Sequence, residues 1–293
     1  MIFLTGSSGF IGAAFNKYFV TNNTLQYRRG SSFEFDEIKS VIHLAGKAHD
    51  LKNTSSSQVY YEVNTELTKK IFDAFLASEA KVFITLSSVK AVADKVDGFL
   101  TEDHIPNPVT HYGKSKLLAE EYIFSKEIPE GKRVYVLRPC MIHGPGNKGN
   151  LNLLYKIVSK NIPWPLGAFD NKRSFCSIDN LMFIFKELIE REDIPSGIYN
   201  VADDEAHSTN NLIRLIAHSQ NRNPKLWNIS KKFIEGVASI GDKLHLPLNS
   251  ERLHKLTSSY VVCNAKIKAA IGKPLPVSSR EGLLKTFKSF NNQ

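Results

Sequence analysis

Short apolar runs alternate with segments of helical periodicity through the first two thirds of the chain. The apolar runs predict strands at Ile2–Thr5, Leu25–Arg28, Ser40–Leu44, Val82–Ser87, Val134–Leu137 and Gly197–Val201. The helical pattern predicts helices at Ile11–Val20, Asn64–Ser78, Gly113–Lys126, Leu151–Asn161 and Asn180–Arg191. Most of the strand segments are apolar at nearly every position, which is typical of strands buried on both faces. The pattern therefore predicts parallel βαβ units with helices on both sides of a sheet.

The pattern changes after residue 205. Residues 206–293 hold helices and proline-containing turns but no regular strand alternation. We expect an α/β fold with a doubly wound, Rossmann-type parallel sheet over residues 1–205 and a smaller C-terminal lobe over residues 206–293. In such a sheet, ligands bind at the carboxyl ends of the strands, near the point where strand order reverses. Functional residues should therefore follow the predicted strands.

Three glycines follow the first predicted strand, in Thr5-Gly6-Ser7-Ser8-Gly9-Phe10-Ile11-Gly12. Gly6 permits a tight turn, Gly9 lets backbone N–H groups approach a pyrophosphate, and Gly12 allows close packing of helix on strand. The spacing predicts a dinucleotide cradle formed by Gly6, Ser8, Gly9, Phe10, Ile11 and Gly12.

The second predicted strand ends in Tyr27-Arg28-Arg29, and no acidic residue occurs before Glu34. An enzyme that uses NAD usually has an acid here for the ribose 2′-hydroxyl, whereas arginine suits a 2′-phosphate. Arg28 and Arg29 therefore favour NADPH as the cofactor. NAD(H) stays open, because the two arginines also fit a solvated surface.

Tyr112 and Lys116 lie four residues apart at the start of a predicted helix, which places them on one face. A lysine cation beside a phenol lowers the phenol pKa from about 10 toward neutrality. Tyr112 would then be a usable general acid or base. Ser88 follows the strand Val82–Ser87 at the carboxyl edge of the sheet, where its hydroxyl can hydrogen-bond a substrate oxygen. The order of glycine turn, hydroxyl and Tyr–Lys pair predicts an active site.

These motifs, together with VIHLAG (41–46), VNTELT (63–68) and LRPCMIHGPG (137–146), resemble those of the extended short-chain dehydrogenases/reductases. The similarity is to the nucleotide-sugar epimerase/dehydratase family and covers essentially the whole chain. It implies a catalytic triad of Ser88, Tyr112 and Lys116. It also implies that the cofactor contacts Leu44, Ala45, Gly46, Asn64, Leu86, Ser87, Tyr112, Lys116, Pro139 and Ile142.

A narrower resemblance lies in the segments SSVK (87–90), GPGNKGN (144–150), PWPLG (163–167) and NKRS (171–174). They are similar to bacterial enzymes that reduce UDP-4-keto-6-deoxy-N-acetylhexosamines for capsule or O-antigen polysaccharide. The implied product is UDP-N-acetyl-fucosamine or UDP-N-acetyl-quinovosamine. Residues 141–178 and the C-terminal lobe would form the substrate site, and the implied substrate contacts are Ser88, Lys90, Tyr112, Asn150, Arg173 and Arg252.

The residues after Ser88 bear on the reaction type. Sugar 4,6-dehydratases of the family have an acid pair there, whereas this chain has Val89 and Lys90, so dehydration is disfavoured. The sequence also departs from the family at Ala91-Val92-Ala93 and at His143, where tyrosine is frequent. The stretch from Gly30 to Ser40 is too short for the usual third strand and helix. A UDP-hexose 4-epimerase with tightly bound NAD+ and a non-catalytic NADP(H)-sensing regulator stay as alternatives.

The composition narrows the choice of partners. Lys and Arg exceed Asp and Glu by 38 to 29, a net charge of +9, which suits nucleic acid, anionic lipid or a small polyanion. Because no nucleic-acid motif is present, we assign the charge to a dinucleotide, a UDP-sugar and a solvated surface. Histidine spacing predicts no metal site. Three cysteines without paired spacing, no signal pattern and no membrane-spanning apolar stretch predict a cytoplasmic protein. A homodimer is common in the family.

One helical face in the C-terminal lobe admits two interpretations. Phe233, Val237, Ile240 and Leu244 share a face, with Lys231, Lys232 and Lys243 nearby. A helix that lies on a membrane surface has this pattern, and so does a helix packed on a domain. We expect the second arrangement.

Overall fold

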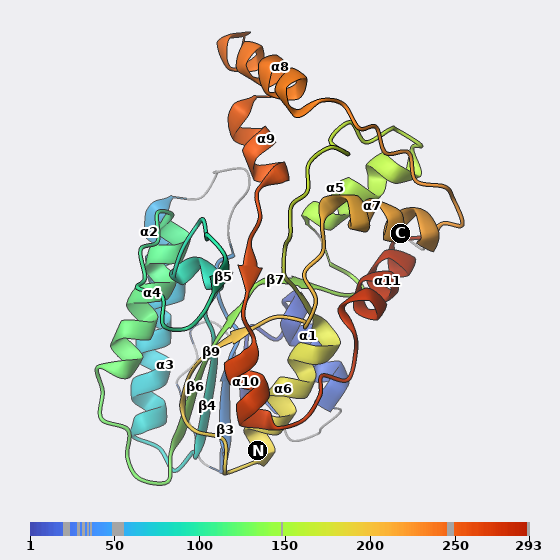
Figure 1. Ribbon diagram of the computed structural model, residues 1–293. Helices are drawn as coiled ribbons and strands as arrows, with labels where there is room; N and C mark the ends of the chain where they lie inside the picture. Colours follow the sequence, from blue (N-terminus) through green and yellow to red (C-terminus); the bar gives the residue numbers. More distant parts are fainter. Residues whose placement is uncertain are drawn as a thin grey trace.

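A six-stranded parallel sheet with helices on both faces forms the larger part of the computed structural model (Figure 1). The structure describes residues 1–19, 24–27, 30, 33, 35, 37–48, 56–147, 149–244 and 249–291. The strand order is β2-β1-β3-β4-β6-β9. The strands are β1 (Ile2–Thr5), β2 (Thr24–Gln26), β3 (Ser40–His43), β4 (Val82–Leu86), β6 (Arg133–Pro139) and β9 (Gly197–Val201). The order reverses between β1 and β3, which confirms the predicted doubly wound sheet.

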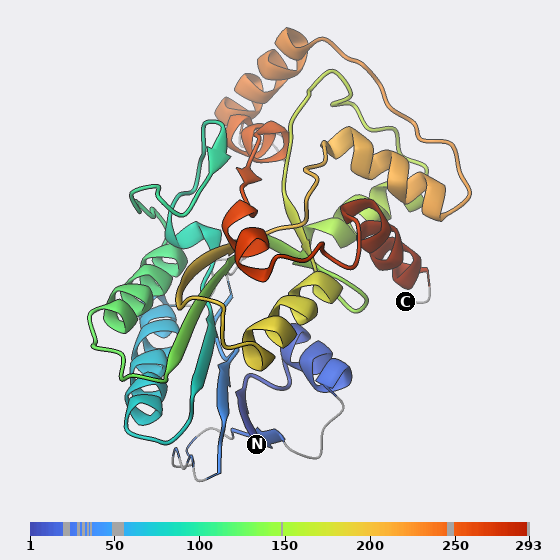
Figure 2. The ribbon, with the colours of Figure 1, turned by 60° about the horizontal axis from the view of Figure 1, so that its bottom comes forward.

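Helices cover the two faces of the sheet separately (Figures 1 and 2). One face carries α2 (Ser57–Tyr61), α3 (Leu67–Leu76) and α4 (His111–Phe124), and the other carries α1 (Phe10–Phe19) and α6 (Ile178–Glu190). Successive residues of a strand point into different hydrophobic cores. Val41 and Phe83 pack in the core that contains Phe72 of α3. Their neighbours Ile42 and Ile84 pack in the core on the other face, which contains Phe15 and Phe185. This double burial explains the unbroken apolar runs.

Apart from shifts of one or two residues at the ends of elements, the structure differs from the predicted elements in two places. The helix expected at Asn64–Ser78 begins earlier, at Ser57, and passes through a π-helical turn over Glu62–Glu66 before α3. Two small parallel sheets were not predicted: β7 (Met141–His143) with β8 (Phe175–Ser177), and β5 (Phe99–Leu100) with β10 (Val261–Val262). Strands of two or three residues are too short to show alternation. Among the described residues, no strand lies beyond β2 at its edge of the sheet.

A second hydrophobic core lies outside the sheet. It is built by α5 (Asn150–Ser159), α7 (Thr209–Ser219), α8 (Lys231–Leu244), α9 (Ser250–Thr257) and α11 (Ser279–Phe290). In contrast, α10 (Ala265–Ile271) packs back on the core of the sheet through Ile267 and Ile271. Residues from both sides of position 205 thus contribute to the second core, and the domain boundary there stays a prediction.

Helix α8 does not pack as expected. Its buried seam consists of Ile234, Ala238 and Gly241, whereas the apolar face of Phe233 and its three partners is exposed to solvent. The expectation that this face packs on the domain is therefore wrong. The contact with the second core is made instead by Ile234 and Ala238, which lie on the neighbouring face of the helix.

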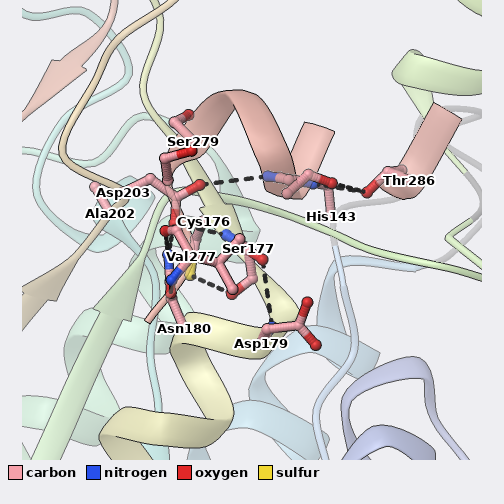
Figure 3. Close-up of polar contacts among 12 residues, drawn as sticks. His143, Cys176, Ser177, Asp179, Asn180, Ala202, Asp203, Val277, Ser279 and Thr286 are labelled. Atoms are coloured by element: carbon pink, nitrogen blue, oxygen red, sulfur yellow. Dashed lines mark hydrogen bonds and ion pairs between the residues drawn. The ribbon is translucent and has the colours of Figure 1, made fainter. Parts of the chain in front are cut away.

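A buried network around Asp203 connects the sheet to the second core (Figure 3). Oδ1 of Asp203 accepts hydrogen bonds from the backbone N of Ser177 at 2.9 Å and from Nδ2 of Asn180 at 2.7 Å. Oδ2 lies 3.4 Å from Nε2 of His143, and Nδ1 of His143 lies 2.9 Å from Oγ1 of Thr286 in α11. One carboxylate thus joins the end of β9 to α6, β7 and α11.

Candidate active site

The turn from β1 to α1 brings the three glycines together. Gly6 has φ +69°, and a Cβ on it would lie 2.6 Å from the backbone N of Ala45. A Cβ on Gly12 would lie 2.2 Å from the carbonyl oxygen of Gly6, so both positions require glycine. Ser8 and Gly9 are exposed at the tip of the turn, and Phe10 and Ile11 are half-buried behind it. The turn therefore presents exposed backbone at the helix N-terminus, the geometry that a pyrophosphate cradle requires.

A chain of buried hydrogen bonds runs from this turn toward α4. The backbone N of Ala45 donates to Oγ1 of Thr5 at 3.0 Å, and Thr5 lies 2.7 Å from Nδ1 of His43. Nε2 of His43 lies 2.9 Å from Oγ1 of Thr68, whose hydroxyl donates to the carbonyl of Asn64. Burial and, secondarily, the charge of Lys116 lower the pKa of His43 to about 3, so the ring is neutral. Nδ1 then accepts from Thr5, and Nε2–H donates to Thr68.

Asn64 holds the loop after β3 against α4. Its Oδ1 accepts from the backbone N of Lys47 at 2.8 Å, and its Nδ2 donates to the carbonyl of Lys47 and, at 3.0 Å, to Oγ of Ser115. A Cβ on Gly46 would lie 3.2 Å from both Oδ1 of Asn64 and Nζ of Lys116. The π-helical turn thus places Asn64 where it fixes the loop of Leu44, Ala45 and Gly46.

The carboxyl end of β4 presents the predicted hydroxyl pair. Ser88 accepts a hydrogen bond from the backbone N of Lys90 at 3.2 Å and thereby caps the 3₁₀ turn Val89–Ala91. The hydroxyl of Ser88 is also hydrogen-bonded to Tyr112. Ser87 Oγ is buried, and within the described chain it has no hydrogen-bond partner. An unpartnered buried hydroxyl at this edge of the sheet is available to a ligand.

The start of α4 brings Tyr112 to Ser88. Thr110 caps the helix by accepting from the backbone N of Gly113 at 3.1 Å. A Cβ on Gly113 would lie 2.3 Å from the carbonyl oxygen of Lys90, so only glycine lets the helix meet the 3₁₀ turn this closely. One turn later, Nζ of Lys116 is buried and donates to the carbonyl of Leu86 at 2.7 Å. The structure therefore brings Ser88, Tyr112 and Lys116 together.

The pKa of Tyr112 shifts in the direction opposite to the one expected from the sequence. Burial raises the pKa of Tyr112 above its usual value, and the hydrogen bond with Ser88 opposes this rise. The expected fall of the Tyr112 pKa toward neutrality is not found, because burial outweighs the contacts that favour the phenolate. Burial lowers the pKa of Lys116 to about 8, and the charge of Glu120 on the same helix raises it in part.

A buried ion pair fixes α4 to the sheet beneath this site. Nε of Arg138 in β6 lies 3.0 and 3.1 Å from the two carboxylate oxygens of Glu120, and its Nη2 also contacts Oε2. Both side chains are 3% exposed. Two other predicted cofactor contacts lie nearby. Pro139 is the buried last residue of β6 and pairs with Val201, and Ile142 is half-buried in β7, the next strand along the chain.

The residues at this edge fit a dinucleotide. The glycine turn offers exposed backbone without side chains. The unpartnered hydroxyl of Ser87 lies at the end of β4, next to β3, which the loop with Ala45 and Gly46 follows. Arg28 and Arg29, the predicted contacts of a ribose 2′-phosphate, lie outside the described residues. Their role stays a prediction.

On the substrate side, Lys90 is held by residues that the sequence did not indicate. Its Nζ lies 4.3 Å from the ring centre of Tyr260 and 3.7 Å from Oδ1 of Asp94. The hydroxyl of Tyr260 donates to the carbonyls of Val89 and Ala93 at 3.2 and 2.8 Å. Tyr260 therefore clamps the turn that follows Ser88. The sequence feature that could have indicated this contact is the apolar pair Val261–Val262 after Tyr260, which forms β10.

The other predicted substrate contacts are Asn150 in α5, Arg252 in α9 and Arg173, which lies just before β8. The guanidinium of Arg173 donates to the carbonyl and hydroxyl of Ser258, at 3.0 and 3.1 Å, and to the carbonyl of Lys255. It therefore holds the C-terminal end of α9, the helix that carries the exposed Arg252 in its first turn. Asn150 is exposed at the first position of α5, which follows Gly149.

The described part of the chain holds no group of three or more His, Cys, Asp or Glu side chains placed to bind a metal ion. Among the same residues, no helix is long and apolar enough to cross a membrane.

Comparison with known proteins agrees with this geometry. The chain is 29% identical over 320 residues to UDP-glucose 4-epimerase from Vibrio cholerae, covering 99% of this chain and 95% of that protein. It is 24% identical over 242 residues to GDP-6-deoxy-D-mannose reductase from Pseudomonas aeruginosa, covering 74% of this chain and 79% of that protein. The solved structure of MoeE5 in complex with UDP-glucuronic acid and NAD has the same fold, with a TM-score of 0.75 at 18% identity over 99% of both chains. The family model described as NAD dependent epimerase/dehydratase matches residues 2–202, and the chain therefore belongs to the NAD dependent epimerase/dehydratase family.

Proposed function

We propose that this protein is a nucleotide-sugar oxidoreductase that uses NADPH to reduce the C4 ketone of a UDP-4-keto-6-deoxy-N-acetylhexosamine. The product would be UDP-N-acetyl-fucosamine or UDP-N-acetyl-quinovosamine, made in the cytoplasm for a surface polysaccharide. The observation that carries the proposal is the convergence of Ser88, Tyr112 and Lys116 at the carboxyl edge of β4. The similarity to a GDP-6-deoxy-D-mannose reductase supports a reduction.

Each of the three side chains has a role in this reaction. Ser88 donates a hydrogen bond to the ketone oxygen, and Tyr112 gives its proton to that oxygen as it becomes an alkoxide. The ammonium of Lys116 stabilises the tyrosinate that remains. A bound dihydronicotinamide supplies the hydride to C4. The raised pKa of Tyr112 suits a proton donor, because the phenol stays protonated throughout the neutral range.

The charge of Lys116 predicts the pH dependence. A lysine is charged below its pKa, and burial lowers the pKa of Lys116 to about 8. We therefore expect kcat/KM to fall as the pH rises above about 8, since this parameter reports the free enzyme. Lys116→Arg, which keeps its charge, should remove this alkaline fall even if its maximal rate is lower. Lys114→Arg, at an exposed position two residues earlier, should leave the profile unchanged. A flat profile from pH 7 to 10 in the wild type would contradict the assignment.

The remaining site residues are assigned by the same proposal. The cofactor would contact the turn from Gly6 to Gly12, the loop Leu44–Gly46, and residues 64, 86, 87, 139 and 142. The UDP pyrophosphate would lie between Arg173, Arg252 and the start of α5 at Asn150, with Lys90 near the sugar. Arginines suit this role because they bind phosphate oxygens bidentately.

A 4-epimerase is the second candidate, and one observation favours it: the Vibrio cholerae relative, a UDP-glucose 4-epimerase, aligns over nearly the whole chain. The two candidates use the same three side chains, but an epimerase returns its hydride to the sugar and therefore keeps its cofactor. The experiment mixes purified protein with UDP-4-keto-6-deoxy-GlcNAc and NADPH, follows the reduced nicotinamide absorbance and identifies the product by NMR. We expect stoichiometric NADPH loss with this sugar and none with UDP-GlcNAc or UDP-galactose. Interconversion of UDP-GlcNAc and UDP-GalNAc without added cofactor would contradict the reductase assignment and favour the epimerase.

Arg28 and Arg29 predict the cofactor preference. We expect a higher kcat/KM with NADPH than with NADH, and a selective fall for NADPH in the double variant Arg28→Ala and Arg29→Ala. Loss of a charge-assisted hydrogen bond costs about 1.5–3 kcal/mol, or roughly 10- to 150-fold. Measurement with NADH is the internal control, because NADH lacks the 2′-phosphate. If the double variant lowers both values equally, the arginines do not select the phosphate.

A further inference from the structure

The exposed apolar face of α8 has no part in the catalytic site. It consists of Phe233, Val237, Ile240 and Leu244, here called the α8 stripe. Their side chains are 64%, 36%, 55% and 64% exposed. At about 100° per residue, the four positions fall within roughly 60° of the helix circumference. Helix α8 lies at the end of the molecule farthest from the N-terminus (Figures 1 and 2).

Charged residues are distributed unevenly around this stripe. Lys232 and Lys243 lie on one flank, roughly 100° from its middle, and the buried seam lies on the other flank. Glu235 and Asp242 lie roughly 170° away, on the opposite face. An apolar stripe with a lysine flank and distant acids is the arrangement of a helix that lies in the headgroup layer of a membrane. The lysine stems can follow the apolar surface while the ammonium groups reach lipid phosphates.

We propose that α8 is a reversible docking helix for an anionic lipid surface. The charges beside the stripe support this occupant, because Lys232 and Lys243 attract anionic lipid phosphates and no acidic residue of the helix lies on that flank. The size of the stripe points the same way: it offers four side chains, whereas a standard protein interface uses about 20–30 residues a side. The proposal does not depend on which nucleotide sugar the enzyme uses.

The experiment measures co-flotation of the full-length protein with vesicles. The probes are vesicles of equal parts phosphatidylglycerol and phosphatidylcholine, and vesicles of phosphatidylcholine alone. We expect binding to the first kind only, weakened by high salt. Phe233→Ser with Ile240→Ser should lower partition at least roughly tenfold, because two apolar side chains no longer insert. Lys232→Glu with Lys243→Glu should lower it roughly 30-fold or more.

Matched controls test the placement of these residues. Leu153→Ser removes an apolar side chain that is 61% exposed on α5, and Lys186→Glu with Lys288→Glu makes the same change in net charge at other exposed sites. Both controls should bind vesicles like the wild type. Absence of wild-type binding at low salt, or equal binding to neutral vesicles, would overturn the proposal. So would stripe variants that dissociate a dimer in ultracentrifugation, or that raise KM for the soluble sugar nucleotide without vesicles.

Discussion

Tyr112→Phe is expected to lower turnover by roughly 10²–10⁴-fold, the usual range for loss of a general acid. The variant keeps the ring and its contact with Tyr60, whose ring centre lies 6.4 Å away, and removes only the hydroxyl that is hydrogen-bonded to Ser88. Cofactor binding should change little, because the glycine turn and the loop after β3 are untouched. The measurements are kcat for NADPH oxidation with the 4-keto sugar and a fluorescence titration of NADPH.

Tyr60→Phe is the matched control for this variant. It removes a hydroxyl from the neighbouring aromatic ring and leaves Tyr112 and Ser88 in place. We expect its turnover to stay within about tenfold of the wild type, well short of the loss of an acid. If Tyr112→Phe kept turnover in that same range, Tyr112 would not be the proton donor. If both variants lost activity equally, the loss would be assigned to disturbed packing of the Tyr60–Tyr112 pair and not to the missing proton donor.

The predicted strands match the structure where the sequence itself marks their ends. β1 and β9 have the predicted bounds, Ile2–Thr5 and Gly197–Val201, and a glycine with positive φ lies at the end of the first and at the start of the second. Gly6 must have such a φ to turn the chain into α1. The prediction of Ser88, Tyr112 and Lys116 as one site used the same logic, because motifs that follow parallel strands meet at one edge of the sheet.

Other parts of the site depend on contacts that no local pattern encodes. Tyr260 clamps the turn after Ser88 from a position about 170 residues later in the chain. His43 is the polar last residue of β3, and only the structure shows that Thr5 and Thr68 satisfy both of its ring nitrogens. The fall in Tyr112 pKa was expected from spacing alone, yet burial dominates and raises it. Spacing specifies which side chains are near, but burial decides their charge.

Glu120 shows how the packing beneath the site controls the site itself. It lies one turn after Lys116, and its charge raises the pKa of that lysine against the effect of burial. Arg138 in β6 holds the carboxylate in place. Glu120→Gln should therefore shift the alkaline fall in kcat/KM toward lower pH, because Lys116 loses a stabilising charge. The ion pair thus connects the stability of α4 to the protonation of the catalytic lysine.

Glu120→Ala is expected to lower the free energy of unfolding by about 3–5 kcal/mol, because it leaves the guanidinium of Arg138 buried without its counter-charge. Both side chains are 3% exposed, so water cannot replace the lost partner. A domain has only about 5–15 kcal/mol of stability, so the loss is a large fraction of the total. Urea unfolding followed by circular dichroism measures the change through the midpoint.

The double variant Glu120→Ala with Arg138→Met separates the buried charge from the lost packing. It removes both members of the pair, so no unpaired charge remains in the interior. Replacing both partners of a buried pair by apolar residues is often neutral, so the double variant should recover most of the loss. Recovery would show that the cost of the single variant comes from an uncompensated guanidinium. A double variant as unstable as Glu120→Ala would instead assign the loss to a cavity between α4 and β6, and the ion pair would have no special part in fixing the catalytic helix.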